Sequence, residues 1–420
     1  MGILHPEKLK RIRIWLLDRA YFDSLVKTLS DHGPFHLKAI MKMPPDSKYG
    51  SSYIVGWIPA DIETTLTKQI QQATDGQCII KLEEPGKGEE IPVLLRHGRF
   101  IKPFEKLVLA FGTPSINELD PTLLVAAFFL LVFGLMFADI GHGLLLIILG
   151  LVVLTFEGKV KISGILSYVL DNGSLFLFCG VSGVLGGVLF GDIFGYHIKL
   201  LPFTFTIPKP INVTFPFSPI ENPITMFKLS ILVGAVHIAS GLILNVINKL
   251  SDKKYREAFF EPICWLWFYI ALIYAVFLYT LDLAKWLGSP VMLWGIMLPV
   301  LLMFVGKAML HGFEGFISTI ETLISSLSNT VSYLRIAALS LVHSALSVMI
   351  INMGGGNNPL IIIIGSFFVM VLEGLIIFLH TTRLVWVEWF SKFYKDEGRP
   401  FKSLELEALP KEGVMPSVTM

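Results

Sequence analysis

Long apolar runs dominate the chain after Asp120 and constrain its fold more than any other feature. A transmembrane helix needs about 20 mostly apolar residues to cross the hydrocarbon core of a bilayer. Eight runs approach or exceed that length, and they lie near residues 122–138, 142–157, 172–194, 224–248, 262–282, 290–309, 314–352 and 359–390. The sequence therefore predicts an α-helical polytopic membrane protein with about eight transmembrane helices.

The runs differ in length. The first two are short and are separated only by a glycine-bounded turn, so they fit either full spans or re-entrant, broken helices. The seventh is too long: the segment from Gly315 to Met353 contains no proline and predicts one helix. At 1.5 Å per residue such a helix is near 60 Å long, against a hydrocarbon core of about 30 Å. We expect the last two helices to be steeply tilted.

Charge is concentrated before the apolar runs. Residues 1–120 carry 31 of the 67 Asp, Glu, Lys and Arg residues, and the remaining 300 residues carry 36. We expect a cytosolic lobe and linker over 1–115, a transmembrane domain over 116–395 and a cytosolic tail over 396–420. The net charge of +1 gives no reason to expect a nucleic-acid partner. The three cysteines lack metal-site spacing, so neither a disulfide, a metal nor a cofactor is expected.

The first segment alternates strand and helix signals. The strands are predicted at 11–17, 35–41, 53–58 and 77–82, and the helices at 21–30 and from Pro59 to about Ala73. The order β-α-β-β-α-β is typical of a small α+β ferredoxin-like domain. That fold is shared by many functions, so it does not identify one.

Basic loops set the expected orientation. Eight spans leave both termini on one side of the membrane, together with the basic segments 157–161, 248–256 and 392–399. Cytoplasmic loops carry an excess of Lys and Arg. We therefore expect cytoplasmic termini, in the plasma membrane if the source is prokaryotic.

Nine ionisable side chains fall inside the predicted spans, where lipid cannot solvate them. They are Asp139, His142, Asp192, Glu321, Arg335, His343, Glu373, His380 and Arg383. Any one of them alone could instead form a structural ion pair or extend to the membrane interface. This structural alternative has most weight for Asp139 and Asp192. Nine in one chain indicate side chains that face an ion path.

The helical rise gives these residues an expected depth. Both arginines lie near mid-depth, His343 and Glu373 share the outer side, and Glu321 lies on the inner side. Asp139 and Asp192 end the first and third spans on the outer side, in the similar phrases L-M-F-A-D-I-G and V-L-F-G-D-I-F-G. The pattern predicts two polar half-paths that meet at fixed positive charges.

The chemistry of the side chains fits that arrangement. Carboxyls and imidazoles can pass protons, because their pKa values can be brought near physiological pH. Arginine keeps its proton, so a proton path stops there, although its charge can attract a carboxylate. Arg335 has no obvious acid near it, and we therefore expect its counter-ion to come from another subunit.

These phrases resemble a known family, the membrane stator subunit (subunit a or subunit I) of V-type and archaeal-type rotary ATPases. The matching phrases are S-Y-L-R-I-A-A-L-S-L-V-H (332–343), E-G-L-I-I-F-L-H-T-T-R-L-V-W-V-E-W-F-S-K-F-Y (373–394), D-P-T-L-L (120–124), M-F-A-D-I-G-H-G (136–143), I-V-G-W-I-P (54–59) and P-F-E-K-L-V-L-A-F-G-T-P (103–114). Together they cover nearly the whole membrane part and the end of the cytosolic part.

The resemblance implies a non-catalytic stator subunit with two ion half-channels beside a rotating proteolipid c-ring, held by peripheral-stalk and central-stalk-associated subunits. Arg335 matches the family's essential arginine and Arg383 its second arginine. Glu373 and His343 match residues of the non-cytoplasmic half-channel, and Glu321 matches a further acidic position. The ion, proton or sodium, and the direction of coupling to ATP stay open, because the ion-binding carboxyl lies on the ring.

One feature departs from the family. Its members usually insert a long helical arm and a distal lobe between the early strands, where this chain has only M-P-P-D-S-K-Y-G (43–50). The chain therefore resembles a compact version. Two other functions remain open: a stand-alone secondary transporter with a cytosolic regulatory domain, which would show internal inverted repeats, and an intramembrane metallohydrolase, for which no H-E-x-x-H motif occurs.

Overall fold

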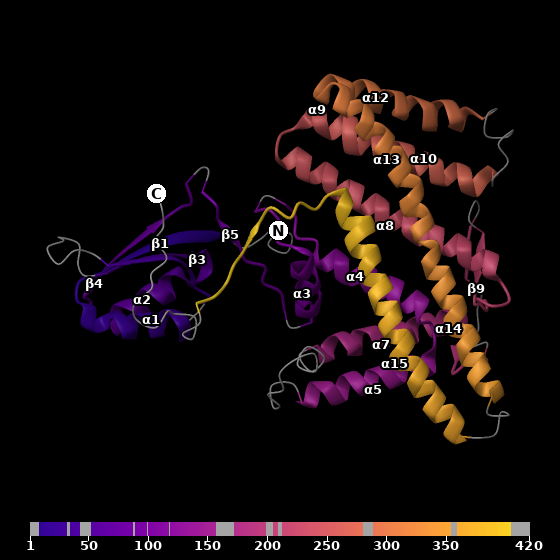
Figure 1. The fold of residues 1–420 in the computed structure, drawn as a ribbon, viewed down its shortest axis with the longest axis horizontal. Helices are drawn as coiled ribbons and strands as arrows, with labels where there is room; N and C mark the ends of the chain where they lie inside the picture. Colours follow the sequence, from indigo (N-terminus) through magenta and orange to yellow (C-terminus); the bar gives the residue numbers. More distant parts are fainter. Residues whose placement is uncertain are drawn as a thin grey trace. The chain divides into compact units, whose positions relative to one another are not determined.

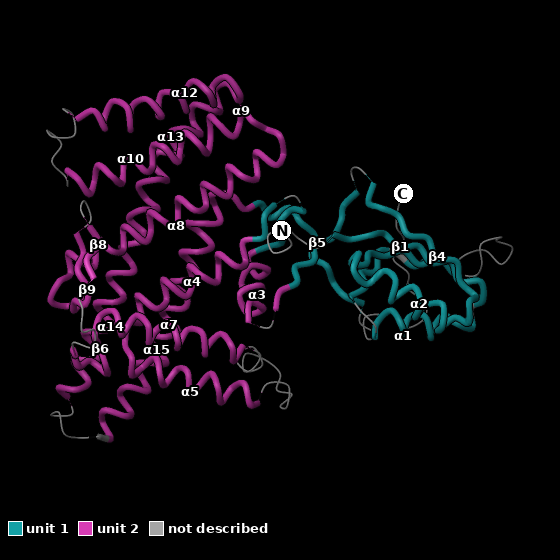
Figure 2. Tube along the Cα trace, turned by 180° about the vertical axis from the view of Figure 1, so that it is seen from behind, with its two compact units in different colours: residues 1–96, 112–120, 395–420 teal, residues 97–111, 121–394 magenta. Residues whose placement is uncertain are grey.

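A computed structural model describes residues 8–31, 34–42, 52–86, 89–98, 100–116, 118–156, 172–198, 205–208, 212–279, 289–353 and 359–404. The chain divides into two compact units (Figure 2). The first comprises residues 1–96, 112–120 and 395–420, and the second comprises residues 97–111 and 121–394. The short connection at 43–50 and the basic turn at 157–161 lie outside the described residues.

The first unit is built on a four-stranded antiparallel sheet with the strand order β2-β3-β1-β4. Its elements are β1 (Leu9–Leu16), α1 (Phe22–Asp31), β2 (His36–Lys42), β3 (Ser52–Pro59), α2 (Glu63–Ala73) and β4 (Cys78–Glu83). Successive side chains of a strand point to opposite faces. In β1 this period places Ile12 and Ile14 in the core and Arg11 and Arg13 on the other face, where Arg11 forms ion pairs with Glu83 and Glu89.

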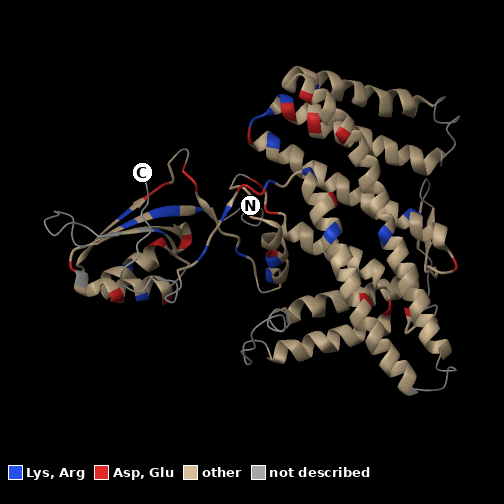
Figure 3. Ribbon diagram, viewed as in Figure 1, with Lys and Arg blue, Asp and Glu red and all other residues tan. Residues whose placement is uncertain are grey.

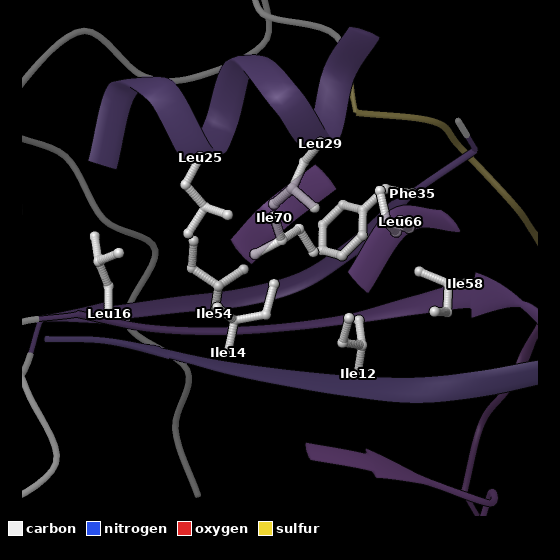
Figure 4. Packing of buried hydrophobic residues seen from close by; sticks show 10 residues of the cluster. All are labelled: Ile12, Ile14, Leu16, Leu25, Leu29, Phe35, Ile54, Ile58, Leu66 and Ile70. Carbon is white, nitrogen blue, oxygen red and sulfur yellow. The ribbon is translucent and has the colours of Figure 1, made fainter. Parts of the chain in front are cut away.

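The core of this unit lies between the sheet and the two helices (Figure 4). Leu25 and Leu29 of α1, and Leu66 and Ile70 of α2, are spaced by four residues, so each pair lies on one helix face. All four side chains are at most 1% exposed. Burying each one contributes roughly 1.5–3 kcal/mol to folding. The two amphipathic helices are therefore held by the sheet.

The chain returns to the first unit after its last long helix. β10 (Arg399–Pro400) pairs in parallel with β5 (Pro92–Val93). The carboxylate of Asp396 accepts a hydrogen bond from the Thr113 amide at 2.9 Å, and the Gly398 amide donates to the Thr113 carbonyl at 3.1 Å. Residues far apart in sequence thus meet within one compact unit.

The second unit is helical (Figure 1). Its helices are α3 (Lys102–Phe111), α4 (Thr122–Met136), α5 (Ile140–Phe156), α7 (Gly173–Phe190), α8 (Pro223–Ser251), α9 (Tyr255–Ala258), η3 (Phe259–Ile263), α10 (Cys264–Tyr279), η4 (Val291–Met297), α12 (Leu298–His311), α13 (Phe313–Ser332), α14 (Leu334–Met353), α15 (Pro359–Arg383), η5 (Leu384–Trp389) and η6 (Phe390–Lys392). Short strands β6 (Asp192–Ile193) and β7 (Tyr196–His197) form one hairpin, and β8 (Phe205–Ile207) pairs with β9 (Val213–Phe215).

Each of the eight predicted apolar runs contains a helix. Six helical segments of the described chain are long and apolar enough to cross a membrane, as judged by length and composition, and the chain is a multi-pass membrane protein. These six are Gly173–Phe190, Pro223–Ser251, Tyr255–Tyr279, Val291–His311, Phe313–Met353 and Leu360–Lys392. The first two runs form the shorter apolar helices α4 and α5, of 15 and 17 residues.

Glycines allow α5 and α7 to approach each other closely. A Cβ atom on Gly150 would lie 2.6 Å from the backbone nitrogen of Leu177, and one on Gly180 would lie 2.7 Å from the backbone nitrogen of Ile147. Small residues at helix interfaces are the usual means of tight packing in membranes, where apolar burial between helices gains little. The same close packing brings α7 against the turn that follows α4, since a Cβ atom on Gly187 would lie 2.7 Å from the Asp139 backbone.

The structure corrects the expectation of one uninterrupted helix over 315–353. The chain keeps a right-handed helical conformation at Tyr333, but the α-helical hydrogen-bond pattern is interrupted there, because the amides of Tyr333 and Ile336 bond to carbonyls three residues earlier. The buried Tyr333 ring lies on Gly234, and its hydroxyl lies 2.8 Å from Nδ1 of His237 on α8. Packing against α8 thus sets the break. The last long helix also departs from α geometry, since α15 continues into the π-helical segment η5 directly after Arg383.

Candidate functional site

Asp139 is held at the start of α5 by backbone amides. Its Oδ1 atom accepts hydrogen bonds from the amides of His142, at 2.9 Å, and Phe194, at 3.0 Å. Its Oδ2 atom accepts one from the Gly195 amide at 3.1 Å. An aspartate that bonds to the third amide of a helix is a typical N-cap. The carboxylate is therefore fixed in place, although it is only 1% exposed.

The hairpin β6–β7 supplies two of those amides and a second acidic residue. Its two turn residues, Phe194 and Gly195, both have positive φ angles, of 48° and 81°. Tight two-residue hairpins favour this geometry. Asp192 and His197 lie opposite each other across the hairpin, with His197 Nδ1 3.0 Å from Asp192 Oδ1. Sequence analysis identified Asp192 but not His197, although the spacing Asp-x-x-Gly-x-His marks the turn.

His343 and Glu373 connect α14 to α15. Their side chains form a hydrogen bond through His343 Nδ1 and Glu373 Oε2. Both residues are buried, at 1% and 6% exposure. They are 30 residues apart in sequence, so their contact depends on the packing of α14 against α15. The expectation that they share one level of the helix pair agrees with this contact.

The structure brings five of the predicted residues into one group, which we call the carboxylate–histidine cluster: Asp139, His142, Asp192, His343 and Glu373. The rings of His142 and His343 lie 5.2 Å apart, between centroids. The Ser344 hydroxyl donates to Asp192 Oδ2 at 3.3 Å. A cavity of about 40 Å³ touches Asp139, Asp192 and His343, which is room for about one water-sized species. The cluster is a polar, buried site within an apolar bundle.

Arg335 is the second residue of α14, directly after the break at Tyr333. Its Nη1 atom lies 3.9 Å from Oε1 of Glu388, whose side chain is 3% exposed. The expectation that Arg335 has no acid near it is therefore wrong. Sequence reasoning missed Glu388 because it lies in the last, π-helical segment, 53 residues away, and only the packing of these elements brings the two together.

The contact between Arg335 and Glu388 is long. Among the described residues, neither Arg335 Nη1 nor Glu388 Oε2 has a hydrogen-bond partner. The Arg335 side chain is 18% exposed. A bidentate arginine–carboxylate pair would have contacts nearer 2.7–2.9 Å. The guanidinium is thus close to a counter-charge without being saturated by it.

The remaining predicted residues lie outside the cluster. Arg383 is exposed at the end of α15 and His380 is half-buried one turn earlier, and both interact electrostatically with Arg335. Glu321 is exposed on α13, and within the described chain no hydrogen bond or ion pair involves it. Figure 3 shows how few charged residues lie along the helices of the second unit.

Two lysines in the helical unit were also missed. Lys307 of α12 is 6% exposed and donates to the hydroxyls of Ser318, at 3.2 Å, and Thr322, at 3.0 Å. Lys392 donates to Ser325 at 3.1 Å and lies over the Trp265 ring. A polar face of α13 supplies the three hydroxyls. The recurrence of Ser and Thr at spacings of three and four residues is the sequence pattern that could have predicted this polar helix face.

The family model for the V-type ATPase 116 kDa subunit family matches residues 39–215 and 305–406. All nine ionisable residues predicted inside the spans, and Glu388, fall within the matched ranges.

Curated relatives agree with the family match. The chain is 30% identical to the A-type ATP synthase subunit I of Methanocaldococcus jannaschii, over 87% of this chain and 58% of that protein. It is 27% identical to the A-type ATP synthase subunit I of Pyrococcus horikoshii, over 83% of this chain and 53% of that protein. It is 24% identical to the V-type proton ATPase subunit a1 of Arabidopsis thaliana, over 83% of this chain and 57% of that protein.

The chain spans little more than half the length of these relatives. The family match nevertheless covers more than half of this chain, including both the turn that carries Asp139 and the helices that carry Arg335 and Glu373. The chain therefore belongs to the V-type ATPase 116 kDa subunit family.

Proposed function

We propose that the chain is a non-catalytic stator subunit of a rotary V/A-type ATPase, in which it guides ions to and from a proteolipid c-ring. Membership of the family supports this function, and one structural observation carries it. Arg335 lies in a membrane helix with its buried Nη1 atom 3.9 Å from Glu388, yet the side chain as a whole stays 18% exposed. A charge held in this way is available to a carboxylate from a neighbouring subunit.

The carboxylate–histidine cluster is the proposed outer half-path. It lies beyond Arg335 along α14, because His343 follows Arg335 by eight residues, or about 12 Å of helical rise. Its members are carboxyls and imidazoles, which exchange protons when their pKa values are suitably placed. Asp139 and Asp192 line the same cavity as His343 and form the proposed entrance.

The inner half-path is proposed to run past Glu321. The residue is exposed on α13 and precedes Arg335 by 14 residues, or about 21 Å of helical rise. Arg383 and His380 of α15 form a second group of basic side chains beside Arg335. Ions cannot pass directly between the two half-paths, because they would have to cross fixed positive charge. They must therefore travel on the ring.

Glu388 is proposed to be a positioning residue. Its carboxylate lies on η5 and attracts Arg335 from across the helix pair. At a distance of 3.9 Å the attraction orients the guanidinium while leaving its nitrogens for a second acid. The π-helical turn after Arg383 brings Glu388 to this place, and such turns are frequent at functional sites.

The finer architecture is also proposed. α4 and α5 join the six longer spans to make eight transmembrane helices, and the first unit is a ferredoxin-like lobe, supported by its strand order β2-β3-β1-β4. The proposed boundaries are 1–115, 116–395 and 396–420. Both termini are proposed to be cytoplasmic, and the membrane is the plasma membrane if the source is prokaryotic.

The partners are proposed from the family. Besides the c-ring, they are the peripheral-stalk and central-stalk-associated subunits of the V/A-ATPase, which we expect to contact residues within about 1–115. Cross-linking of the assembled complex tests this contact.

Purification in mild detergent tests the function most directly. We expect a small proteolipid ring and ATPase subunits to co-purify with the full-length chain. A chain that transports a substrate by itself after reconstitution, with no such partners, would instead be a secondary transporter.

A further inference from the structure

We propose that Asp139, His142 and His343 form a binding site for a divalent transition-metal cation such as Zn²⁺, and that the bound cation closes the outer half-path. The three residues each offer one ligand atom, and these atoms all lie within 4.8 Å of one another. All three residues are 1% exposed. The closure of the path rests on the proposed function, whereas the binding site stands on geometry alone.

The ligand set suits zinc chemistry. Zn²⁺ is bound by imidazole nitrogens and carboxylate oxygens at about 2.0–2.2 Å, usually in tetrahedral geometry. That geometry separates neighbouring ligand atoms by roughly 3.3 Å. His142 Nδ1 already lies 3.3 Å from Asp139 Oδ2. All three ligand atoms lie within 4.8 Å of one another, so a shortening of at most about 1.5 Å brings His343 to the same separation.

The imidazole nitrogens are available. Within the described chain, Nε2 of His142 and Nε2 of His343 have no hydrogen-bond partner, and His142 Nδ1 has only the 3.3 Å contact with Asp139 Oδ2. Buried polar atoms without partners are rare, because each costs roughly 1–3 kcal/mol. A cation that accepts these nitrogens as ligands would remove that cost.

Two of the ligands have the supporting contacts that metal ligands usually have. A metal-bound histidine commonly donates its other ring nitrogen to a carboxylate, and metal-bound carboxylates are themselves hydrogen-bonded. His343 uses Nδ1 for Glu373, which leaves Nε2 for a metal. Asp139 is held by the amides of Phe194 and Gly195 and by the His142 amide.

A cation has room and compensating charge. The cavity of about 40 Å³ touches two of the three ligands, Asp139 and His343. Asp192 lines the same cavity, and Glu373 is bonded to His343, so two further carboxylates stand nearby. A water molecule or Asp192 can fill the fourth position. Local spacing motifs could not reveal this site, because His142 and His343 are 201 residues apart.

A bound cation would close the outer half-path for two reasons. It would occupy the imidazole nitrogens that otherwise accept protons. Its charge of +2 would also lie beside Asp139 and Asp192. In a site of low dielectric constant that charge repels an entering cation. Micromolar Zn²⁺ would then inhibit transport reversibly, and a chelator would restore it.

The binding arm of the test uses the purified full-length chain in detergent. Zn²⁺ binding is measured by calorimetry, and Co²⁺ serves as a spectroscopic substitute whose visible absorption reports tetrahedral nitrogen–oxygen ligation. We expect one ion per chain. His142→Ala and His343→Ala should each weaken binding at least tenfold, and Glu373→Gln should weaken it by roughly 10–100-fold. His142→Gln provides a second variant in case the alanine variant unfolds.

His311→Ala is the matched control, since His311 is an exposed histidine on α12 that contacts Glu261 instead of the cluster. Its Zn²⁺ affinity should equal that of the unmodified chain. Binding that His142→Ala and His343→Ala leave unchanged, or the lack of any binding to the unmodified chain, overturns the site.

The transport arm uses the assembled complex in vesicles. Weaker inhibition by Zn²⁺ in the His142→Gln complex than in the unmodified complex, with each rate taken relative to the same complex without Zn²⁺, supports closure of the path. Tight binding to the chain without inhibition of the complex overturns the closure while leaving the site. A complex that transports no ion even without Zn²⁺ contradicts the proposed function instead, so the two failures are distinguishable.

Discussion

Arg335 Nη1 lies 3.9 Å from Glu388 Oε1, and no hydrogen bond joins the two side chains. The acid is nearly fully buried, whereas the Arg335 side chain is 18% exposed. A charge of this kind is attracted to its neighbour but not neutralised by it. The relationship explains how an arginine can persist in an apolar helix and still serve a partner, because Glu388 lowers the cost of burial without using up the donors of Arg335.

Replacing Arg335 with lysine should abolish coupled ion transport. Lysine keeps a positive charge but loses the planar, weakly hydrated group and can lose its proton in an apolar setting. Transport and coupled ATP turnover are measured in reconstituted vesicles, with subunit composition as the check on assembly. Arg335→Gln should fail as well, and Arg383→Gln should be less severe. Transport by Arg335→Lys at the unmodified rate would mean that the arginine has only a structural role.

Glu388→Gln should slow transport without abolishing it. The amide keeps the shape of the side chain but removes the charge that orients Arg335, and we expect a rate reduction of roughly tenfold, equivalent to about 1.4 kcal/mol. Because Arg335→Gln should itself abolish transport, the double-mutant cycle is read from thermal stability, in which the two changes should not be additive. Additive losses of stability would show that Glu388 acts by another route.

Glu373→Gln should slow both ion transport and coupled ATP turnover while the complex stays assembled. The change removes the charge that His343 faces and interrupts the proposed outer half-path. Glu314→Gln is a suitable control, because Glu314 is an exposed acid at the start of α13. Unchanged transport by Glu373→Gln would remove this residue from the path.

Gly195→Ala should destabilise the second unit. Gly195 has a φ angle of 81°, and a Cβ atom there would lie 2.7 Å from the Ser347 backbone. The backbone conformation and the clash together should cost roughly 1–3 kcal/mol. Gly76 has a similar φ angle of 75° and open space around it, so Gly76→Ala measures the backbone cost without the clash. Thermal unfolding in detergent should show the larger loss for Gly195→Ala, and equal losses would contradict the predicted contact.

Glu118 should make the first unit less stable as the pH rises from about 5 to 7. Burial raises the pKa of Glu118 to about 7, although the amides of Ser115 and Lys395 favour its charged form. Between the unfolded pKa, near 4.5, and the folded value, the folded chain holds a proton that the unfolded chain has released. Unfolding is therefore favoured by rising pH, by up to roughly 3 kcal/mol.

Glu118→Gln tests this assignment. It should flatten the pH dependence of thermal stability in this interval and raise stability at pH 7.5, because the amide carries no charge to desolvate. An unchanged pH profile in the variant would show that Glu118 titrates near its ordinary pKa.

Much of the architecture was predictable because its signals are local. Apolar length predicted a helix in each of the eight runs, and the alternation of Ile12 and Ile14 with Arg11 and Arg13 predicted the strand that became β1. Intramembrane charge singled out the candidate site residues, because lipid makes any such charge costly wherever it lies in the fold.

The contacts of the site were less predictable. Glu388 was missed beside Arg335, and His197 was missed opposite Asp192, since neither partner follows from a local period. The interruption at Tyr333 was missed because its cause lies in another helix, where Gly234 and His237 receive the tyrosine ring and hydroxyl.

The sequence by itself determined that this is a multi-pass membrane protein with a charged first lobe and ionisable groups among its helices. Only the tertiary structure decided which of those groups meet. Adjacent positions on a helix point about 100° apart, so small changes in helix packing select different neighbours. The meeting of His142 with His343, and of Arg335 with Glu388, is set by the packing of α5, α14, α15 and η5. Periodicity and composition act within one segment, whereas the site is formed by five elements, α5, β6, α14, α15 and η5.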